Sequence, residues 1–73
     1  MEMKTYLIII EKSSSGFSAY SPDVDGCVAT GITREEAETN MREALEFHLE
    51  GLRRHGLPIP EPQAVSVSVE IPA

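Results

Sequence analysis

The sequence has few of the residues on which metal sites and nucleic-acid platforms depend. It contains one cysteine, Cys27, no tryptophan, two tyrosines and two phenylalanines. A single cysteine cannot form a disulfide within the chain or supply a cysteine-based metal site, which fits a reducing compartment. So few aromatic side chains cannot form a platform on which successive bases stack. These absences exclude a disulfide scaffold and disfavour a zinc-binding domain.

Long apolar runs and positive charge are also scarce. The longest apolar run, residues 7–10, is far shorter than the roughly 20 residues of a membrane span, and no targeting pattern precedes it. Six basic residues stand against twelve acidic ones, which gives a net charge of -6. This balance disfavours a grip on nucleic acid and favours a basic partner. We therefore expect an acidic, cytoplasmic protein without a membrane partner.

The length of 73 residues predicts one domain, residues 1–73. A chain this short buries only about 60% of the surface that its unfolded form exposes. Support from a second subunit or another partner is therefore expected.

Three β-strands are predicted in the first half of the chain, over residues 3–12, 17–21 and 27–31, because β-branched runs alternate there with polar turns. Short turns between them favour an antiparallel meander. Both alternating faces of the first strand are apolar, which predicts an interior strand covered on both sides. One face carries Met3, Leu7 and Ile9, and the other carries Tyr6, Ile8 and Ile10.

A helix is predicted from Arg34 to just before Gly56. Thr33 and Glu36 have the spacing of a capping box, and Gly56 is typical of the residue that ends a helix. Apolar positions recur every three or four residues, which predicts one stripe that packs on the sheet. The stripe is Ala37, Met41, Ala44, Leu45, His48, Leu49 and Leu52.

The chain after the helix predicts an extended connector, residues 57–62, and a fourth strand, residues 65–71. A right-handed crossover places this strand parallel to the first, with sheet order 3-2-1-4. The predicted class is α+β.

One helix can cover only one face of this sheet, so we expect a protein interface on the other. We assign Leu7 and Ile9 to the helix side, which leaves Tyr6, Ile8 and Ile10 as candidate partner contacts. The alternative is that the connector shields this face. The polar face of the last strand is a second candidate interface, through an open edge that pairs with another chain. It carries Ser66, Ser68 and Glu70.

Residues with catalytic or metal-binding chemistry are isolated from one another. Asp23 and Asp25 lack the further oxygen ligands of a calcium loop and are interpreted as turn residues. Cys27 is interpreted as a core residue. His48 and His55 lie about 10 Å apart along the helix, too far for one metal ion. We therefore expect no enzyme activity, no metal and no cofactor.

An ordered series of motifs spans most of the chain, from Tyr6 through Pro62. The residues that carry it are Tyr20, Pro22, Asp23, Gly26, Cys27, Gly31, Thr33, Glu36, Ala37, Asn40, Ala44, Gly56, Pro58 and Pro60. Together they resemble the HicB-like antitoxin family. The resemblance implies a partial ribonuclease-H-like fold in which these residues have structural roles, and such a fold does not confer the nuclease's chemistry.

The resemblance also implies a function. Family members neutralise a small basic toxin of the HicA type, which cleaves RNA, by forming a complex with it, and a charge of -6 suits such a partner. A nuclease site would need clustered carboxylates, whereas the first strand carries only Glu11.

Longer family members add a C-terminal DNA-binding segment. This sequence stops at Ala73, so we expect no such domain and no specific DNA binding. A homodimer or higher oligomer is expected. The alternative function is an orphan HicB-like regulator or oligomeric scaffold without a toxin partner.

Overall fold

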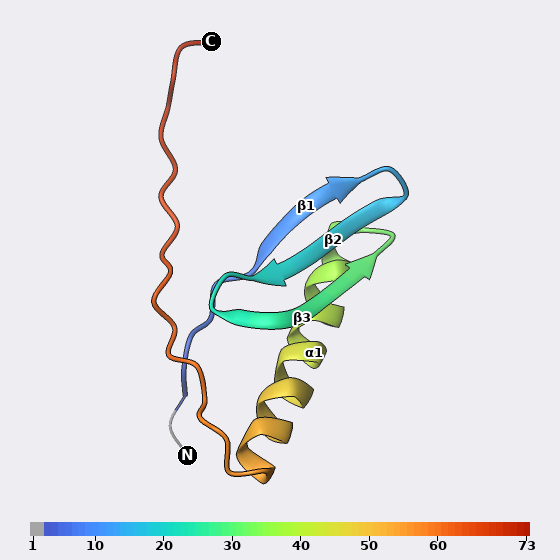
Figure 1. Ribbon diagram of the computed structural model, residues 1–73. Helices are drawn as coiled ribbons and strands as arrows, with labels where there is room; N and C mark the ends of the chain where they lie inside the picture. The colour runs from blue at the N-terminus through green and yellow to red at the C-terminus, as the bar shows by residue number, and fades with distance from the viewer. Residues whose placement is uncertain (1–2) are drawn as a thin grey trace.

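The computed structural model describes residues 3–73 and shows a three-stranded sheet with one helix across it (Figure 1). The strands are β1 (Ile9–Ser13), β2 (Gly16–Ser21) and β3 (Val24–Gly31), and the helix is α1 (Arg34–Arg54). The sheet order is β1-β2-β3, and both strand pairs are antiparallel. The α+β class and the meander are therefore confirmed, although the first strand begins later than expected.

Side chains and backbone cap α1 at both ends. The Thr33 hydroxyl accepts a hydrogen bond from the Glu36 amide at 3.0 Å, and the Glu36 carboxylate accepts one from the Ile32 amide at 2.8 Å. At the other end Gly56 adopts a φ of 68°, and its amide donates to the carbonyl of Arg53 at 3.1 Å. Both caps satisfy backbone groups that a helix leaves without partners. The predicted start and end of the helix are confirmed.

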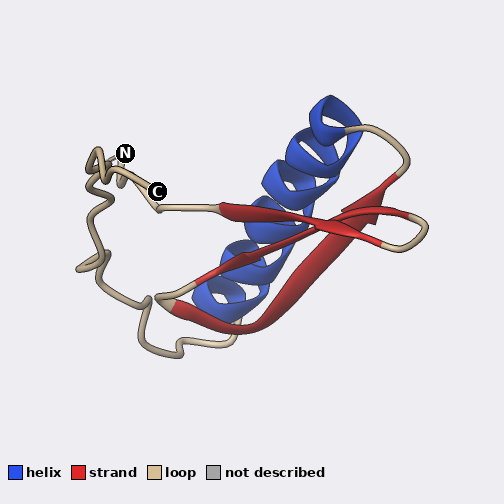
Figure 2. Ribbon diagram, turned by 90° about the horizontal axis from the view of Figure 1, so that it is seen from above, coloured by secondary structure: helices blue, strands red, loops and turns tan. Residues whose placement is uncertain are grey.

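The helix crosses one face of the sheet and packs mainly on β3 and β2 (Figure 2). Its predicted apolar stripe faces the strands, with Ala37, Met41 and Leu45 buried. The buried apolar core is small. It consists of Ala19, Val24, Cys27, Ala37, Met41 and Leu45.

The sheet register decides which side chains face the helix. Cross-strand partners lie on the same face of a sheet, and Ile10 pairs with Ala19, which pairs with Ala29. Ala19 is 2% exposed and belongs to the core, and both of its partners pack against that core. This row therefore lies on the helix side.

The predicted assignment of the two faces of the first strand is wrong. Tyr6, Ile8 and Ile10 pack against the core cluster, on the side that had been given to Leu7 and Ile9. A period of two separates two faces without indicating which one a helix covers, and both faces here are apolar. The pattern alone could not decide between them.

Close approach of β3 to the start of α1 explains why position 31 is glycine. A Cβ atom on Gly31 would lie 2.9 Å from the Cα of Ala37 and collide with the backbone of the first helical turn. The Asn40 side chain reinforces this contact, because its amide nitrogen donates to the carbonyl of Thr30 at 2.8 Å. Two motif residues thus hold the helix against the third strand.

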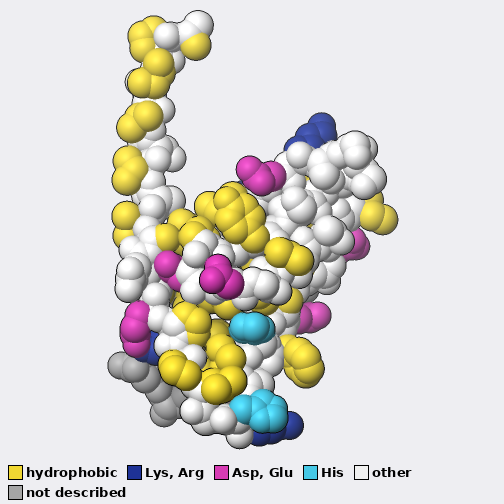
Figure 3. Space-filling model, in the orientation of Figure 1, with side chains coloured by type: hydrophobic (Ala, Val, Ile, Leu, Met, Phe, Trp, Pro, Cys, Tyr) yellow, Lys and Arg dark blue, Asp and Glu magenta, His cyan; other side chains and the backbone are white. Residues whose placement is uncertain are grey.

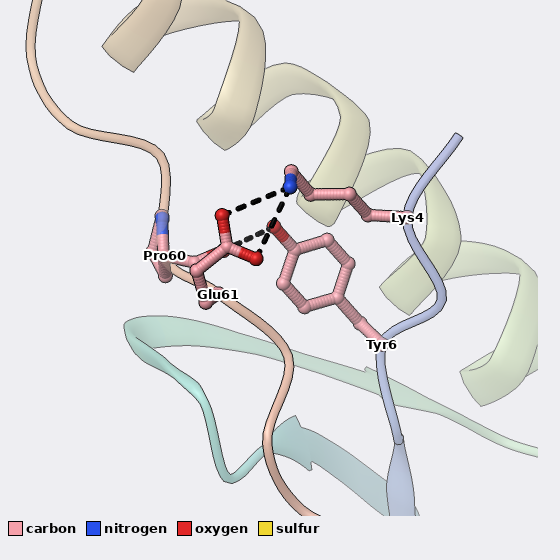
Figure 4. Close-up of polar contacts among 4 residues, drawn as sticks. All are labelled: Lys4, Tyr6, Pro60 and Glu61. Carbon is pink, nitrogen blue, oxygen red and sulfur yellow. Dashed lines mark hydrogen bonds and ion pairs between the residues drawn. The ribbon is translucent and has the colours of Figure 1, made fainter. Parts of the chain in front are cut away.

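After the helix, the connector returns past the segment that leads into β1. The Tyr6 hydroxyl donates to the carbonyl of Pro60 at 2.6 Å, and Lys4 forms an ion pair with Glu61 at 3.0 Å (Figure 4). Proline at position 60 leaves its carbonyl available while donating no amide hydrogen bond of its own. These contacts hold the connector beside the N-terminal segment.

The chain then reaches the turn between β2 and β3. The Asp23 carboxylate accepts hydrogen bonds from the amides of Gln63 and Ala64, both at 2.9 Å. Residues 65–73, here called the tail, leave the body of the molecule from this point (Figure 1). The radius of gyration is 14.0 Å, against about 11 Å for a compact domain of this length.

The expected fourth strand is not part of the sheet of the single chain. Residues 65–71 are extended and alternate as predicted, but within residues 3–73 they pair with no strand, and the order 3-2-1-4 is not formed. The physical reason is the tether to Asp23, which directs the tail away from the edge of β1.

Candidate protein-binding surface

The side of the sheet opposite the helix is apolar and uncovered, and we call it the open face. Its central row is Ile9, Tyr20 and Val28, which pair in register across the three strands. Tyr20 is 40% exposed and Val28 is 70% exposed. Figure 3 views this face and shows hydrophobic side chains among acidic ones. The connector, which had been an alternative cover, leaves these side chains in contact with solvent.

A groove of about 580 Å³ lies between the start of β3 and the C-terminal half of α1. Cys27 and Val28 line it from the strand, Phe47 and His48 from the helix, and Leu57 from the connector. Phe47 is 83% exposed, an unusual state for a phenylalanine in a domain with so little core. The groove and the open face share Val28 and form a continuous surface.

Acidic side chains surround the exposed ring of Phe47. Glu43, Glu46 and Glu50 line a shallow depression with it on the outer face of α1. Glu50 also forms an ion pair with Arg53 at 3.0 Å. An aromatic anchor with a negative rim is complementary to a partner that combines an apolar pocket with basic side chains.

One thiol and two imidazole side chains line the groove. Burial raises the pKa of the Cys27 thiol, which keeps it neutral and poorly nucleophilic. His48 and His55 both line the groove, but residues 3–73 contain no group of three metal-ligating side chains placed to hold an ion. The exposed apolar side chains of the groove, Phe47 and Val28, suit contact with another protein.

The structure separates the two sets of predicted partner contacts. Tyr6, Ile8 and Ile10 lie half-buried on the helix side of the first strand and its lead-in. The other set lies on the exposed tail, and consists of Ser66, Ser68 and Glu70. A partner role for either set stays a prediction, and the structure of one chain does not bring them together.

The sequence reasoning overlooked two residues that matter at this surface. Phe47 lies between Glu46 and His48, off the apolar stripe. An aromatic residue on the polar side of a helix is a sequence signal that could have indicated a binding surface there. Asp23 was interpreted as a turn residue, but its carboxylate also holds Gln63 and Ala64, directly before the tail. No local pattern indicates that second role, because its partners lie 40 and 41 residues away.

Comparison with known families decides the relationship. The family model described as the HicB-like antitoxin of bacterial toxin–antitoxin systems matches residues 6–73. The chain belongs to the HicB-like antitoxin family.

Curated relatives of this HicB-like chain include a phage protein and an archaeal protein. It is 36% identical over 67 residues to an uncharacterized 14.9 kDa protein of Haemophilus phage HP1, and the match covers 92% of this chain and 50% of that protein. It is 34% identical over 65 residues to a UPF0150 protein of Thermoplasma acidophilum, covering 88% of this chain and 94% of the relative. The chain therefore spans half of the first relative and almost all of the second.

Solved structures of HicB3 share this fold. A chain of the HicA3 and HicB3 toxin–antitoxin complex superposes with a TM-score of 0.69 and 40% identity, over 81% of this chain and 70% of that one. The crystal structure of the antitoxin HicB3 gives a TM-score of 0.66 and 42% identity, over 78% of this chain and 42% of that one. In the described part of the HicB-like chain, no helix is long and apolar enough to cross a membrane.

Proposed function

We propose that this chain is an antitoxin that neutralises a small basic RNA-cleaving toxin of the HicA type by direct binding, without catalysis of its own, in the cytoplasm. The observation that carries the proposal is its similarity to a chain of the HicA3 and HicB3 toxin–antitoxin complex, at 40% identity. A net charge of -6 supports a basic partner.

The surface around Phe47 is the proposed toxin contact. An exposed aromatic ring gives the large apolar anchor typical of binding hot spots, and Glu43 and Glu46 give a negative rim. The toxin's basic side chains, which contact RNA phosphates when RNA is bound, would instead contact the carboxylates of Glu43 and Glu46. Occupation of those side chains would block access to RNA.

The test begins with capture of the tagged chain from its host and identification of any small basic protein bound to it. That protein is then expressed alone and together with the chain. We expect growth arrest and messenger RNA cleavage in the first case and relief of both in the second. A captured protein without ribonuclease activity, or activity that the chain does not inhibit, contradicts the antitoxin proposal.

Charge reversal on α1 tests the proposed contact. Glu46→Lys should weaken toxin binding by about 1 to 3 kcal/mol, because it places a cation in the rim. Glu38→Lys is the matched control, because Glu38 is also exposed on α1 but pairs with Arg42 at 3.3 Å, away from Phe47. Equal loss of binding in both variants would indicate a general charge effect and refute the local contact. Isothermal titration calorimetry measures both.

A chain that is recovered only with itself would favour an oligomeric regulator or scaffold without a toxin partner.

Absence of specific DNA binding is also part of the proposal, and a mobility-shift assay with the chain's own promoter region tests it.

A further inference from the structure

The tail has the sequence pattern of a sheet strand, but it pairs with no strand among residues 3–73. Apolar side chains alternate along it with polar ones, and Figure 3 shows them exposed along its length. The apolar set is Val65, Val67, Val69 and Ile71, each between 71% and 81% exposed. A strand with one apolar face normally covers a core, so the tail requires a surface that the single chain does not give it.

Within residues 3–73, β1 pairs with β2 on one side and with no strand on the other. β1 is a terminal strand in the order β1-β2-β3, and yet residues 7–10 are apolar on both faces. None of these four residues is fully buried. Two apolar faces are typical of an interior strand, whereas edge strands are commonly protected by charged side chains. One further strand beside β1 would resolve this conflict.

The chain's own tail is poorly placed to fill that position. Asp23 holds Gln63 and Ala64 at the turn between β2 and β3. The position outside β1 lies about two and a half strand spacings from this turn, or roughly 12 Å. Crossing back would consume about four residues of the tail at 3.3 to 3.6 Å each, more than half of its alternating stretch.

We propose that the tail of one copy of this chain adds as a strand to the β1 edge of a second copy, and that the exchange is reciprocal. Its valines would lie on the helix side, next to Ile8 and Ile10. There they would cover a groove of about 520 Å³ that Tyr6, Leu49 and Ile59 help to line. A two-fold dimer uses both tails and both edges, so no strand remains unpaired. The inference does not depend on a toxin partner.

Light scattering and sedimentation of the purified chain alone test the exchange. We expect a dimer. The double substitution Val67→Asp and Val69→Asp should raise its dissociation constant by at least about tenfold, because it places two charges in the buried row. Ser14→Asp with Ser15→Asp adds the same charges in the exposed turn between β1 and β2 and should leave the dimer intact. A monomeric wild-type chain, or a dimer that both pairs of substitutions affect equally, overturns the proposal.

The substituted valines are exposed in the single chain, so folding should survive their replacement. Far-ultraviolet circular dichroism checks this by the retention of the α1 signal. A mixture of isotope-labelled and unlabelled chains then shows where the tail pairs. Filtered nuclear Overhauser contacts between tail amides of one copy and β1 amides of the other are expected. Contacts found only within one chain, or only between two tails, contradict strand exchange.

Discussion

Ser21 shows how one polar atom can lower the stability of a small core. Its side chain is 4% exposed, and its hydroxyl has no hydrogen-bond partner among residues 3–73. A buried hydroxyl without a partner loses its hydrogen bonds to water on folding, which costs about 1 to 3 kcal/mol. Ser21→Ala should therefore raise the free energy of unfolding by about 1 kcal/mol in urea denaturation.

Ser13→Ala is the control for that measurement, because Ser13 is exposed at the end of β1. It should change the free energy of unfolding by less than about 0.5 kcal/mol. A loss of stability in Ser21→Ala would mean that the hydroxyl has a partner, such as a bound water molecule, and would contradict the prediction.

Cys27 gives the fold a dependence on alkaline pH. Burial raises the pKa of its thiol above the ordinary value of 9.0, so the folded state favours the neutral form. Well below pH 9.0 the thiol is neutral in both states and contributes no pH dependence. Above it the unfolded chain ionises first, and stability falls as pH rises through the folded pKa.

Denaturation of the wild-type chain and of Cys27→Ala at pH 7 and pH 10 isolates this effect. The difference in stability between the two should shrink at the higher pH, because only the wild-type chain carries the thiol. A difference that stays constant between the two pH values would show that the folded and unfolded states bind the thiol proton equally, so that burial does not raise the pKa of Cys27.

Among the elements, α1 depends most on how closely it approaches β3. Gly31→Ala should destabilise the fold by about 1 to 3 kcal/mol, because the added Cβ meets the backbone of Ala37 at 2.9 Å from its Cα. Gly51→Ala makes the same change inside the helix, where the new Cβ would meet nothing within 4 Å apart from its chain neighbours and the helix's own backbone. It should stabilise by about 0.5 to 1 kcal/mol. Thermal denaturation that shifts both variants in the same direction would refute this account.

The elements differ in how much of them the sequence could predict. The limits of α1 followed from local signals, since Thr33, Glu36 and Gly56 act within a few residues of themselves. Local signals could not predict which side of the first strand faces the helix. That choice depends on pairing between Ile10 and Ala19, nine positions apart.

At the scale of the whole molecule, Asp23 decides where the tail begins. Asp23→Ala removes the acceptor of two amide hydrogen bonds, so the amides of Gln63 and Ala64 should exchange with deuterium at least about tenfold faster. Amides in the middle of α1 should keep their protection. Asp25→Ala is the matched control, since Asp25 is exposed close by in β3. Faster exchange in both variants would indicate general loosening of the turn.

The path of the tail was the least predictable feature of the molecule. Residues 65–71 were expected to form a fourth strand because apolar and polar residues alternate there, which is a local property of the sequence. Their position depends on Asp23, Tyr6 and Lys4, which contact residues 60–64 from at least 40 positions away in the sequence. The predicted fourth strand assumed the simplest crossover, and these tethers direct the chain elsewhere. We therefore propose that a second copy of the chain supplies the fourth strand.

The shape of the tail also bears on how long the protein survives in a cell. Proteases bind their substrates as extended segments, and exposed chain ends are where cleavage concentrates. Residues 65–73 already have this conformation and are exposed along their length. Whatever pairs with the tail removes it from proteolytic attack, whereas a chain without a partner presents a ready cleavage site. The lifetime of the protein would then report whether it is assembled.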